Sequence, residues 1–229
     1  MRATMRRFVS VLAVLVLGAA GFLAVAPTAA ADVTYVPETW NGKVIYLSEA
    51  CHDRGDTVCH TNTGCDGFSE NANAFQVAVS TATQDDPDQL NLLERGYKVV
   101  RGNGLTRRNI ANSNRLGADL HLPIHSNAIS KSCETGFSPE RYGTHVMYVS
   151  PAGERCAEIM TERVGAGSPG TNDARHYRSD LGELNQTNAP ACYLEQEFHV
   201  WDKGVAWMRN HGAWTWRIAQ SVDVYMGYP

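Results

Sequence analysis

The chain has 229 residues, of which 43% are hydrophobic and 19% are charged, and its 24 acidic residues outnumber its 20 basic ones. This length and composition fit one globular domain with a sizeable core. The formal net charge of −4 argues against a nucleic-acid-binding protein, because such proteins usually present a basic face.

Residues 1–31 have the pattern of a secretory signal peptide. Three arginines among the first seven residues precede an apolar run from Val9 to about Val25, and small residues follow as far as Ala31. A basic start, an apolar middle and an Ala-x-Ala exit are typical of a cleaved export signal. The apolar run also approaches the length of a membrane span, so a retained anchor is the alternative. We predict cleavage after Ala31 and a single secreted domain over residues 32–229, without stable membrane insertion.

The cysteines predict disulfide bonds. An even number of cysteines in an exported chain favours disulfides, although spacing alone leaves most pairings open. Cys59 and Cys65 are close enough in sequence to close a small loop, which is the one pairing we predict. A structural zinc cluster of cysteines with His52 and His60 is the alternative, but the Cys-x2-Cys spacing is missing. The six cysteines are Cys51, Cys59, Cys65, Cys133, Cys156 and Cys192.

Short apolar runs alternate with amphipathic segments along the chain. Strands are predicted at 44–47, 97–100, 118–125, 144–149 and 191–194, and helices from Ser69 to about Ala82, then at 89–95, 107–116, 153–164 and over most of 203–225. Residues 32–43 are predicted to be an extended lead-in, and residues 165–188 mostly loop. This alternation predicts an α/β fold: a single domain with a twisted, mostly parallel sheet flanked by helices.

One predicted strand carries a histidine to its end. Leu120, Leu122 and Ile124 alternate with His121 and His125, so the apolar and imidazole side chains lie on opposite faces. Ligands in α/β sheets bind beyond the carboxyl ends of strands, which makes His125 a candidate site residue. His121 lies about 13 Å from His125 along an extended strand. It is therefore predicted to be a hydrogen-bonded interior histidine and not a second ligand.

Two further predicted ligands lie at corresponding places. His52 follows the strand at 44–47, and Glu70 lies in the first turn of a helix capped by Ser69. Two imidazoles and one carboxylate with an open fourth position form a common catalytic zinc shell. His60 is the alternative to His52 as the first ligand.

A carboxylate is predicted to work beside the metal. Glu195 directly follows the strand at 191–194, where it is placed to take a proton from a water and pass it to a leaving nitrogen. Glu197 is its rival, because alternation places both on one strand face. Arg107 and Asn127 are predicted to contact substrate, with the alternative that each satisfies backbone groups. Surface positions are expected for three histidines in predicted loops and helices: His176, His199 and His211. His199 is also close enough to Glu195 in sequence to line a cleft, which is the alternative for that residue.

Five segments of the chain match a known pattern: Arg107 with Ala111-Asn112, Ala118-Asp119-Leu120, Ile124-His125-Ser126-Asn127-Ala128, Gly143-Thr144-His145-Val146 and Pro190-Ala191-Cys192-Tyr193-Leu194-Glu195. With them, the chain resembles the zinc-dependent N-acetylmuramoyl-L-alanine amidases of the amidase-3 family over residues 44–225. The usual Asp-Pro-Gly-His-Gly-Gly around the first histidine is replaced here by Ser48-Glu49-Ala50-Cys51-His52-Asp53-Arg54.

The resemblance implies hydrolysis of the amide between N-acetylmuramic acid and L-alanine in peptidoglycan, with Zn²⁺ as the cofactor. It implies His52, Glu70 and His125 as metal ligands and Glu195 as the catalytic residue of a domain over residues 32–229.

Two other functions fit the same residues. A zinc peptidase that cuts stem peptides would use the same ligands, and a relative with an altered first motif would bind the wall without cutting it. The chain has no Gly-x-Ser-x-Gly motif, which disfavours a serine hydrolase. Peptidoglycan is the expected partner, and nucleic acid is not.

Overall fold

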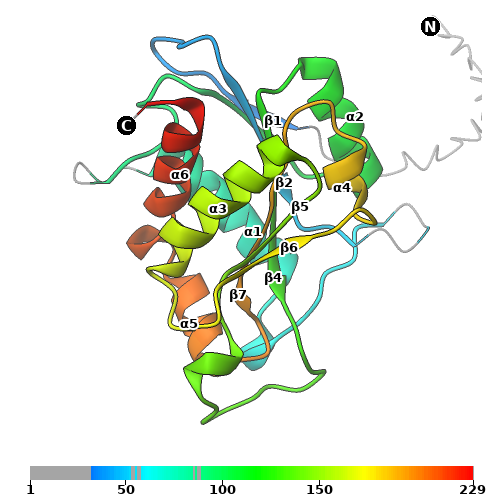
Figure 1. The fold of residues 1–229 in the computed structure, drawn as a ribbon, viewed down its shortest axis with the longest axis vertical. Coiled ribbons are helices and arrows are strands. Elements are labelled where there is room, and N and C mark those ends of the chain that lie inside the picture. The colour runs from blue at the N-terminus through cyan, green and yellow to red at the C-terminus, as the bar shows by residue number, and fades with distance from the viewer. Residues whose placement is uncertain (1–31, 53–54, 56–57, 85, 87–88, 229) are drawn as a thin grey trace, which may run out of the picture.

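The computed structural model of the chain describes residues 32–52, 55, 58–84, 86 and 89–228 (Figure 1). The predicted signal peptide, residues 1–31, lies outside the described residues, so its cleavage stays a prediction. Among the described residues, no helix is both long enough and apolar enough to cross a membrane.

The described residues form seven strands and six α-helices. The strands are β1 (Val33–Tyr35), β2 (Val44–Glu49), β3 (Lys98–Gly102), β4 (Leu120–Asn127), β5 (His145–Tyr148), β6 (Ala174–Tyr177) and β7 (Tyr193–Phe198). The helices are α1 (Glu70–Thr83), α2 (Thr106–Leu116), α3 (Pro151–Gly165), α4 (Gly182–Asn185), α5 (Asp202–Arg209) and α6 (Trp216–Met226).

All seven strands join one sheet in the order β1-β3-β2-β4-β7-β5-β6. The four central strands, β3, β2, β4 and β7, run parallel to one another. β1 runs antiparallel to β3, β5 runs antiparallel to β7, and β6 runs parallel to β5. The predicted fold, a single α/β domain with a mostly parallel sheet flanked by helices, is confirmed.

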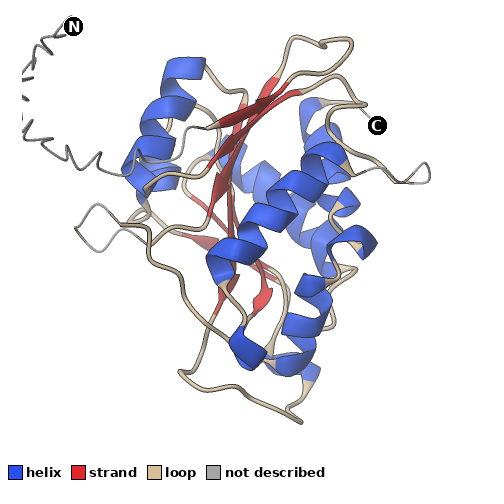
Figure 2. Ribbon diagram, turned by 180° about the vertical axis from the view of Figure 1, so that it is seen from behind, coloured by secondary structure: helices blue, strands red, loops and turns tan. Residues whose placement is uncertain are grey.

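Helices cover both faces of the sheet, as Figure 2 shows with the sheet between two groups of helices. α1, α3 and α6 pack on one face, while α2 and α4 pack against each other on the opposite face. Leu120, Leu122 and Ile124 of β4 are fully buried in the core with α1, α3 and α6. His121 points the other way, and its Nε2 lies 3.2 Å from Oε1 of Glu183 in α4. The predicted alternation along β4 and the interior role of His121 are both confirmed.

Local signals set two helix ends as predicted. The Ser69 hydroxyl accepts a hydrogen bond from the Ala72 amide at 3.3 Å, so Ser69 caps α1 and Glu70 is its first residue. α2 ends at Gly117, whose φ of 61° is a left-handed conformation that glycine adopts without steric cost.

Several predicted boundaries were wrong. β7 continues to Phe198, so Glu195 lies within the strand and not beyond it. β4 continues to Asn127, past the end predicted at His125. Residues 165–188 contain β6 and α4, residues 32–43 contain β1, and residues 89–95 form turns where a helix was predicted. β1 and β6 are short edge strands whose side chains are mostly exposed, so their sequences show little apolar periodicity. Pairing with a neighbouring strand stabilises them.

All six cysteines form disulfides, which confirms the prediction of disulfides and excludes the cysteine–zinc cluster. The predicted Cys59–Cys65 pair was wrong. Cys59 pairs with Cys51, because an antiparallel bridge between His52 and His60 brings their Cα atoms to 5.1 Å. The other two disulfides are Cys65–Cys133 and Cys156–Cys192.

Candidate metal centre

His52, Glu70 and His125 converge at the carboxyl ends of β2 and β4. His52 follows β2, Glu70 opens α1, and His125 is near the end of β4. Nε2 of His52 lies 2.6 Å from Oε2 of Glu70, and Nδ1 of His125 lies 3.0 Å from Oε1 of Glu70. One potential ligand atom from each residue lies within 4.8 Å of the other two, so the three side chains are able to hold a metal ion.

The chemistry of these donors fits zinc. Imidazole nitrogens and one carboxylate oxygen form the protein shell of many catalytic zinc sites, which keep one position open for water or substrate. Glu70 also accepts a hydrogen bond from the Ser126 amide at 3.0 Å. Burial opposes ionisation of Glu70, yet hydrogen bonds with His125 and His52 hold its pKa below the usual range. The carboxylate is therefore in the charged form that a cation requires.

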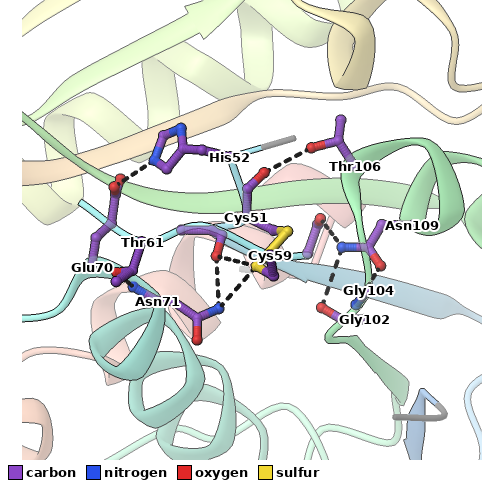
Figure 3. The surroundings of a disulfide bond; sticks show 12 residues. Cys51, His52, Cys59, Thr61, Glu70, Asn71, Gly102, Gly104, Thr106 and Asn109 are labelled. Atoms are coloured by element: carbon purple, nitrogen blue, oxygen red, sulfur yellow. Dashed lines mark hydrogen bonds and ion pairs between the residues drawn. A yellow bond between two sulfur atoms is a disulfide. The ribbon is translucent and has the colours of Figure 1, made fainter. Parts of the chain in front are cut away.

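The segment that carries His52 is held by bonds on both sides (Figure 3). The Asn71 side chain donates to the Ala50 carbonyl at 2.8 Å, and the Thr106 hydroxyl donates to the Cys51 carbonyl at 3.0 Å. The Cys51–Cys59 disulfide closes this segment. These restraints act on the segment that replaces the Asp-Pro-Gly-His-Gly-Gly motif of the amidase-3 pattern.

His60, the predicted alternative to His52 as a metal ligand, contacts His52 through the backbone. It forms the antiparallel backbone bridge with His52, with the His52 amide donating to the His60 carbonyl at 3.0 Å. The group of potential metal ligands found among the described residues contains His52, and His60 is outside it.

Glu195 stands beside the three potential ligands. β4 and β7 pair His125 directly with Glu195. Oε2 of Glu195 is buried and has no hydrogen-bond partner among the described residues. Burial, together with the negative charge of Glu70, raises the pKa of Glu195 well above its usual range. A buried carboxylate without a partner costs free energy, so this side chain is available to a ligand or a water.

The Glu197 carboxylate, unlike that of Glu195, is held by hydrogen bonds within the protein. Its carboxylate accepts hydrogen bonds from the Ser168 hydroxyl, from the Gly170 amide at 3.2 Å and from the Phe198 amide at 2.9 Å. These bonds anchor the segment after α3 to β7.

Two cavities flank the centre. The first, of about 540 Å³, is lined by His52 and His125 and also by Arg107. The second, of about 530 Å³, is lined by Glu195 and Asn127. Asn127 Nδ2 lies 3.3 Å from His145 Nδ1, so its side chain is already held by one neighbour. Arg107 and Asn127 thus lie beside the centre in separate cavities, and their contact with substrate stays a prediction.

Sequence reasoning missed one residue beside the centre, Tyr193, and expected a surface position for another, His199. Tyr193 stacks on His125, with ring centroids 4.4 Å apart, and its position two residues before Glu195 on one strand was the available signal. His199, for which a surface role was expected, is only 2% exposed. Its Nδ1 lies 2.9 Å from the Ser126 hydroxyl, which places it behind the strand segment that carries His125.

Opening the Cys51–Cys59 disulfide is expected to weaken metal binding without unfolding the domain. In Cys51→Ser/Cys59→Ser, the segment of His52 would gain conformational freedom worth roughly 2–3 kcal/mol for a loop of this size. Because a bound metal needs this segment ordered, the affinity for the metal should fall roughly 30-fold to 150-fold. Competition with a chromogenic chelator measures the affinity, and urea unfolding checks the fold.

The Cys156–Cys192 disulfide supplies the control. It joins α3 to the residue before β7, and both of its cysteines are buried in the hydrophobic core. Cys156→Ala/Cys192→Ala should lower the free energy of unfolding while the folded protein binds metal normally. Unchanged metal affinity in the Cys51→Ser/Cys59→Ser variant would mean that the hydrogen bonds to Ala50 and Cys51 alone hold His52.

The fold is shared with solved amidase domains. The N-acetylmuramoyl-L-alanine amidase from Clostridium difficile 630 superposes with a TM-score of 0.64 at 16% identity, covering 81% of this chain and 97% of that one. The amidase Ami1 from Mycobacterium smegmatis gives 0.63 at 16% identity, covering 83% and 100%. The catalytic domain of CwlV from Bacillus (Paenibacillus) polymyxa var. colistinus gives 0.61 at 18% identity, covering 82% and 99%.

No family model matches the chain, and no curated protein matches its sequence. At the identities of the solved structures, the likeness establishes the fold. The chain therefore has the fold of N-acetylmuramoyl-L-alanine amidase catalytic domains, as its sequence motifs led us to expect.

Proposed function

We propose that the chain is a secreted, zinc-dependent N-acetylmuramoyl-L-alanine amidase. Its substrate would be the amide between the lactyl group of N-acetylmuramic acid and L-alanine in peptidoglycan. One observation carries the proposal: His52, Glu70 and His125 converge beside the buried, unpartnered Glu195. They do so in a fold that N-acetylmuramoyl-L-alanine amidases also have.

The residues divide the chemistry among them. His52, Glu70 and His125 would hold the zinc, which supplies Lewis acidity that polarises a carbonyl oxygen and makes a neighbouring water more acidic. Glu195 would accept a proton from the attacking water and deliver it to the leaving nitrogen. The hydroxyl adds to the carbonyl carbon, so the products are a lactyl carboxylate and a free L-alanine amine.

Three further residues have proposed roles that follow from their positions around the centre. Tyr193 packs on His125 and would keep its ring in one orientation. Arg107 and Asn127 would contact substrate from the two cavities that flank the centre. The three disulfides support export, because such bonds persist in oxidising compartments.

Product analysis tests the proposal. The chain purified from culture medium should hold about one zinc ion per molecule, as a single three-ligand shell implies. It should release peptides with free L-alanine amino termini from purified peptidoglycan, as read by mass spectrometry. Chelation should stop the release, and added zinc should restore it.

Three outcomes would contradict the proposal in different ways. Cuts within the stem peptides would identify a zinc peptidase instead. Wall binding without metal and without products would identify a non-catalytic wall-binding protein. Cleavage that survives complete removal of metal would exclude the assigned role of His52, Glu70 and His125.

A further inference from the structure

The second cavity, the one beside Glu195, has a basic lining. His145, His176, Arg175 and Arg178 line it together with the single acid Glu195. This contrasts with the acidic balance of the chain as a whole. A cavity with such a lining favours an anionic group on its occupant.

Strand register places one of these arginines on the same face as Glu195. β5 pairs His145 with Glu195 of β7, and Met147 with His176 of β6. Residues that are directly paired, or two apart on one strand, share a face of a sheet. Arg178 lies two residues beyond His176, and its amide continues the ladder by donating to the Tyr148 carbonyl at 2.8 Å.

Arg175 differs from Arg178 in its orientation. It lies on the alternate face of β6, and its Nη1 is 3.5 Å from Oε1 of Glu158 in α3. Arg178 instead follows the face that Glu195 shares with His145 and His176, and it lines the same cavity as Glu195. Arg178 is thus the arginine whose charge faces the proposed catalytic residue.

The Arg178 guanidinium is oriented and still has donors to offer. Its Nε and Nη2 each donate to the Asp180 carboxylate at 2.8 Å, which fixes the plane of the group. A guanidinium has five N–H donors, and within the described residues this side chain uses two of them in these bonds. The remaining edge matches the two oxygens of a carboxylate.

The chemistry of the proposed reaction indicates which part of the substrate lies in this second cavity. Glu195 delivers a proton to the leaving nitrogen, so that nitrogen must lie within reach of Glu195. The leaving nitrogen is the amine of L-alanine, the first residue of the stem peptide. The stem therefore extends from Glu195 into the cavity that Glu195 lines, and its second residue carries a carboxylate in its unmodified form.

We propose that the cavity lined by His176 and Arg178 binds the free carboxylate of the stem residue that follows L-alanine. This proposal rests on the proposed amidase function and deepens it, because it makes Arg178 a determinant of specificity. Arg178 would distinguish stems with a free carboxylate from stems in which that group is a carboxamide. His176, on the same face, would contribute a second polar contact.

A pair of substrates tests the proposal without any variant. Muramyl-L-alanyl peptides with a free carboxylate on the second residue are compared with the same peptides carrying a carboxamide there. We expect kcat/KM of the wild type to be about tenfold higher for the acid, as for one charge-assisted contact. The preference should shrink as salt is added, because Arg178 is partly exposed. Equal cleavage of the two substrates would overturn the subsite and leave the amidase function intact, whereas cleavage of neither would overturn the function itself.

Variants then locate the preference. Arg178→Gln should abolish it by raising KM for the acid alone, with metal content and thermal midpoint close to wild type. Arg155→Gln removes an exposed positive charge from α3 and should keep the tenfold preference. Arg107 in the first cavity is the competing cation, so loss of the preference in Arg107→Gln together with its retention in Arg178→Gln would place the carboxylate there and refute the proposal.

Discussion

Replacing Glu195 with glutamine is expected to lower kcat by about 10²–10⁴ while about one metal ion per chain stays bound. The amide keeps the size of the side chain but cannot accept the proton of the attacking water. Glu195 lies outside the group of three potential metal ligands, so their geometry should survive the change. Release of L-alanine amines from peptidoglycan gives the rate, and elemental analysis gives the metal content.

Glu197→Gln is the matched control, two residues along the same strand. Its carboxylate is occupied by the Ser168 hydroxyl and by the Gly170 and Phe198 amides. We expect the free energy of unfolding of this variant to fall by about 1–3 kcal/mol, because the hydrogen bonds to a buried acceptor are weakened. Its kcat should stay close to that of the wild type. An undiminished rate in Glu195→Gln, or a loss of kcat confined to Glu197→Gln, would mean that the proton acceptor has been misassigned.

Replacing His52 with alanine is expected to lower zinc affinity by more than about a hundredfold and to abolish cleavage. Loss of an outer partner of a metal ligand typically costs tenfold to a hundredfold, and loss of one of three direct ligands costs more. The side chain of His52 is 31% exposed, so the fold should tolerate its removal. Competition with a chelator gives the affinity, and circular dichroism checks the fold.

His60→Ala separates the metal-ligand role from the role of the surrounding loop. His60 reaches His52 through backbone atoms, and alanine retains those atoms. We therefore expect this variant to bind about one zinc per chain and to cleave at a rate within a few fold of the wild type. The reverse result, with metal lost in His60→Ala and kept in His52→Ala, would exchange the two assignments.

The centre was largely predictable because its elements follow local rules. Alternation of Leu120, Leu122 and Ile124 set the orientation of β4, and the Ser69 cap placed Glu70 at the start of α1. Parallel strands then bring their carboxyl ends to one edge of the sheet, where ligands gather. The sequence also pointed to His52 despite its altered motif, because its place after β2 is independent of that motif.

What sequence reasoning missed depends on contacts between distant segments. β6 is mostly exposed and forms by pairing with β5, so its residues lack the periodicity of a buried strand. Cys65 pairs with Cys133 across 68 residues, a contact that short spacing rules cannot anticipate. Arg178 gains its position from that same unpredicted strand, which is why the second cavity was absent from the sequence interpretation.

The Cys65–Cys133 disulfide has a consequence for survival outside the cell. The segment between these cysteines contains both Glu70 and His125. A protease that makes one cut anywhere in this segment leaves two pieces that the disulfide still joins. The potential ligands on the two sides of the nick therefore stay in one molecule, where packing against the sheet can hold them in place. Reduction of the nicked protein would separate the pieces, so resistance to proteolytic inactivation is expected to depend on an oxidising environment.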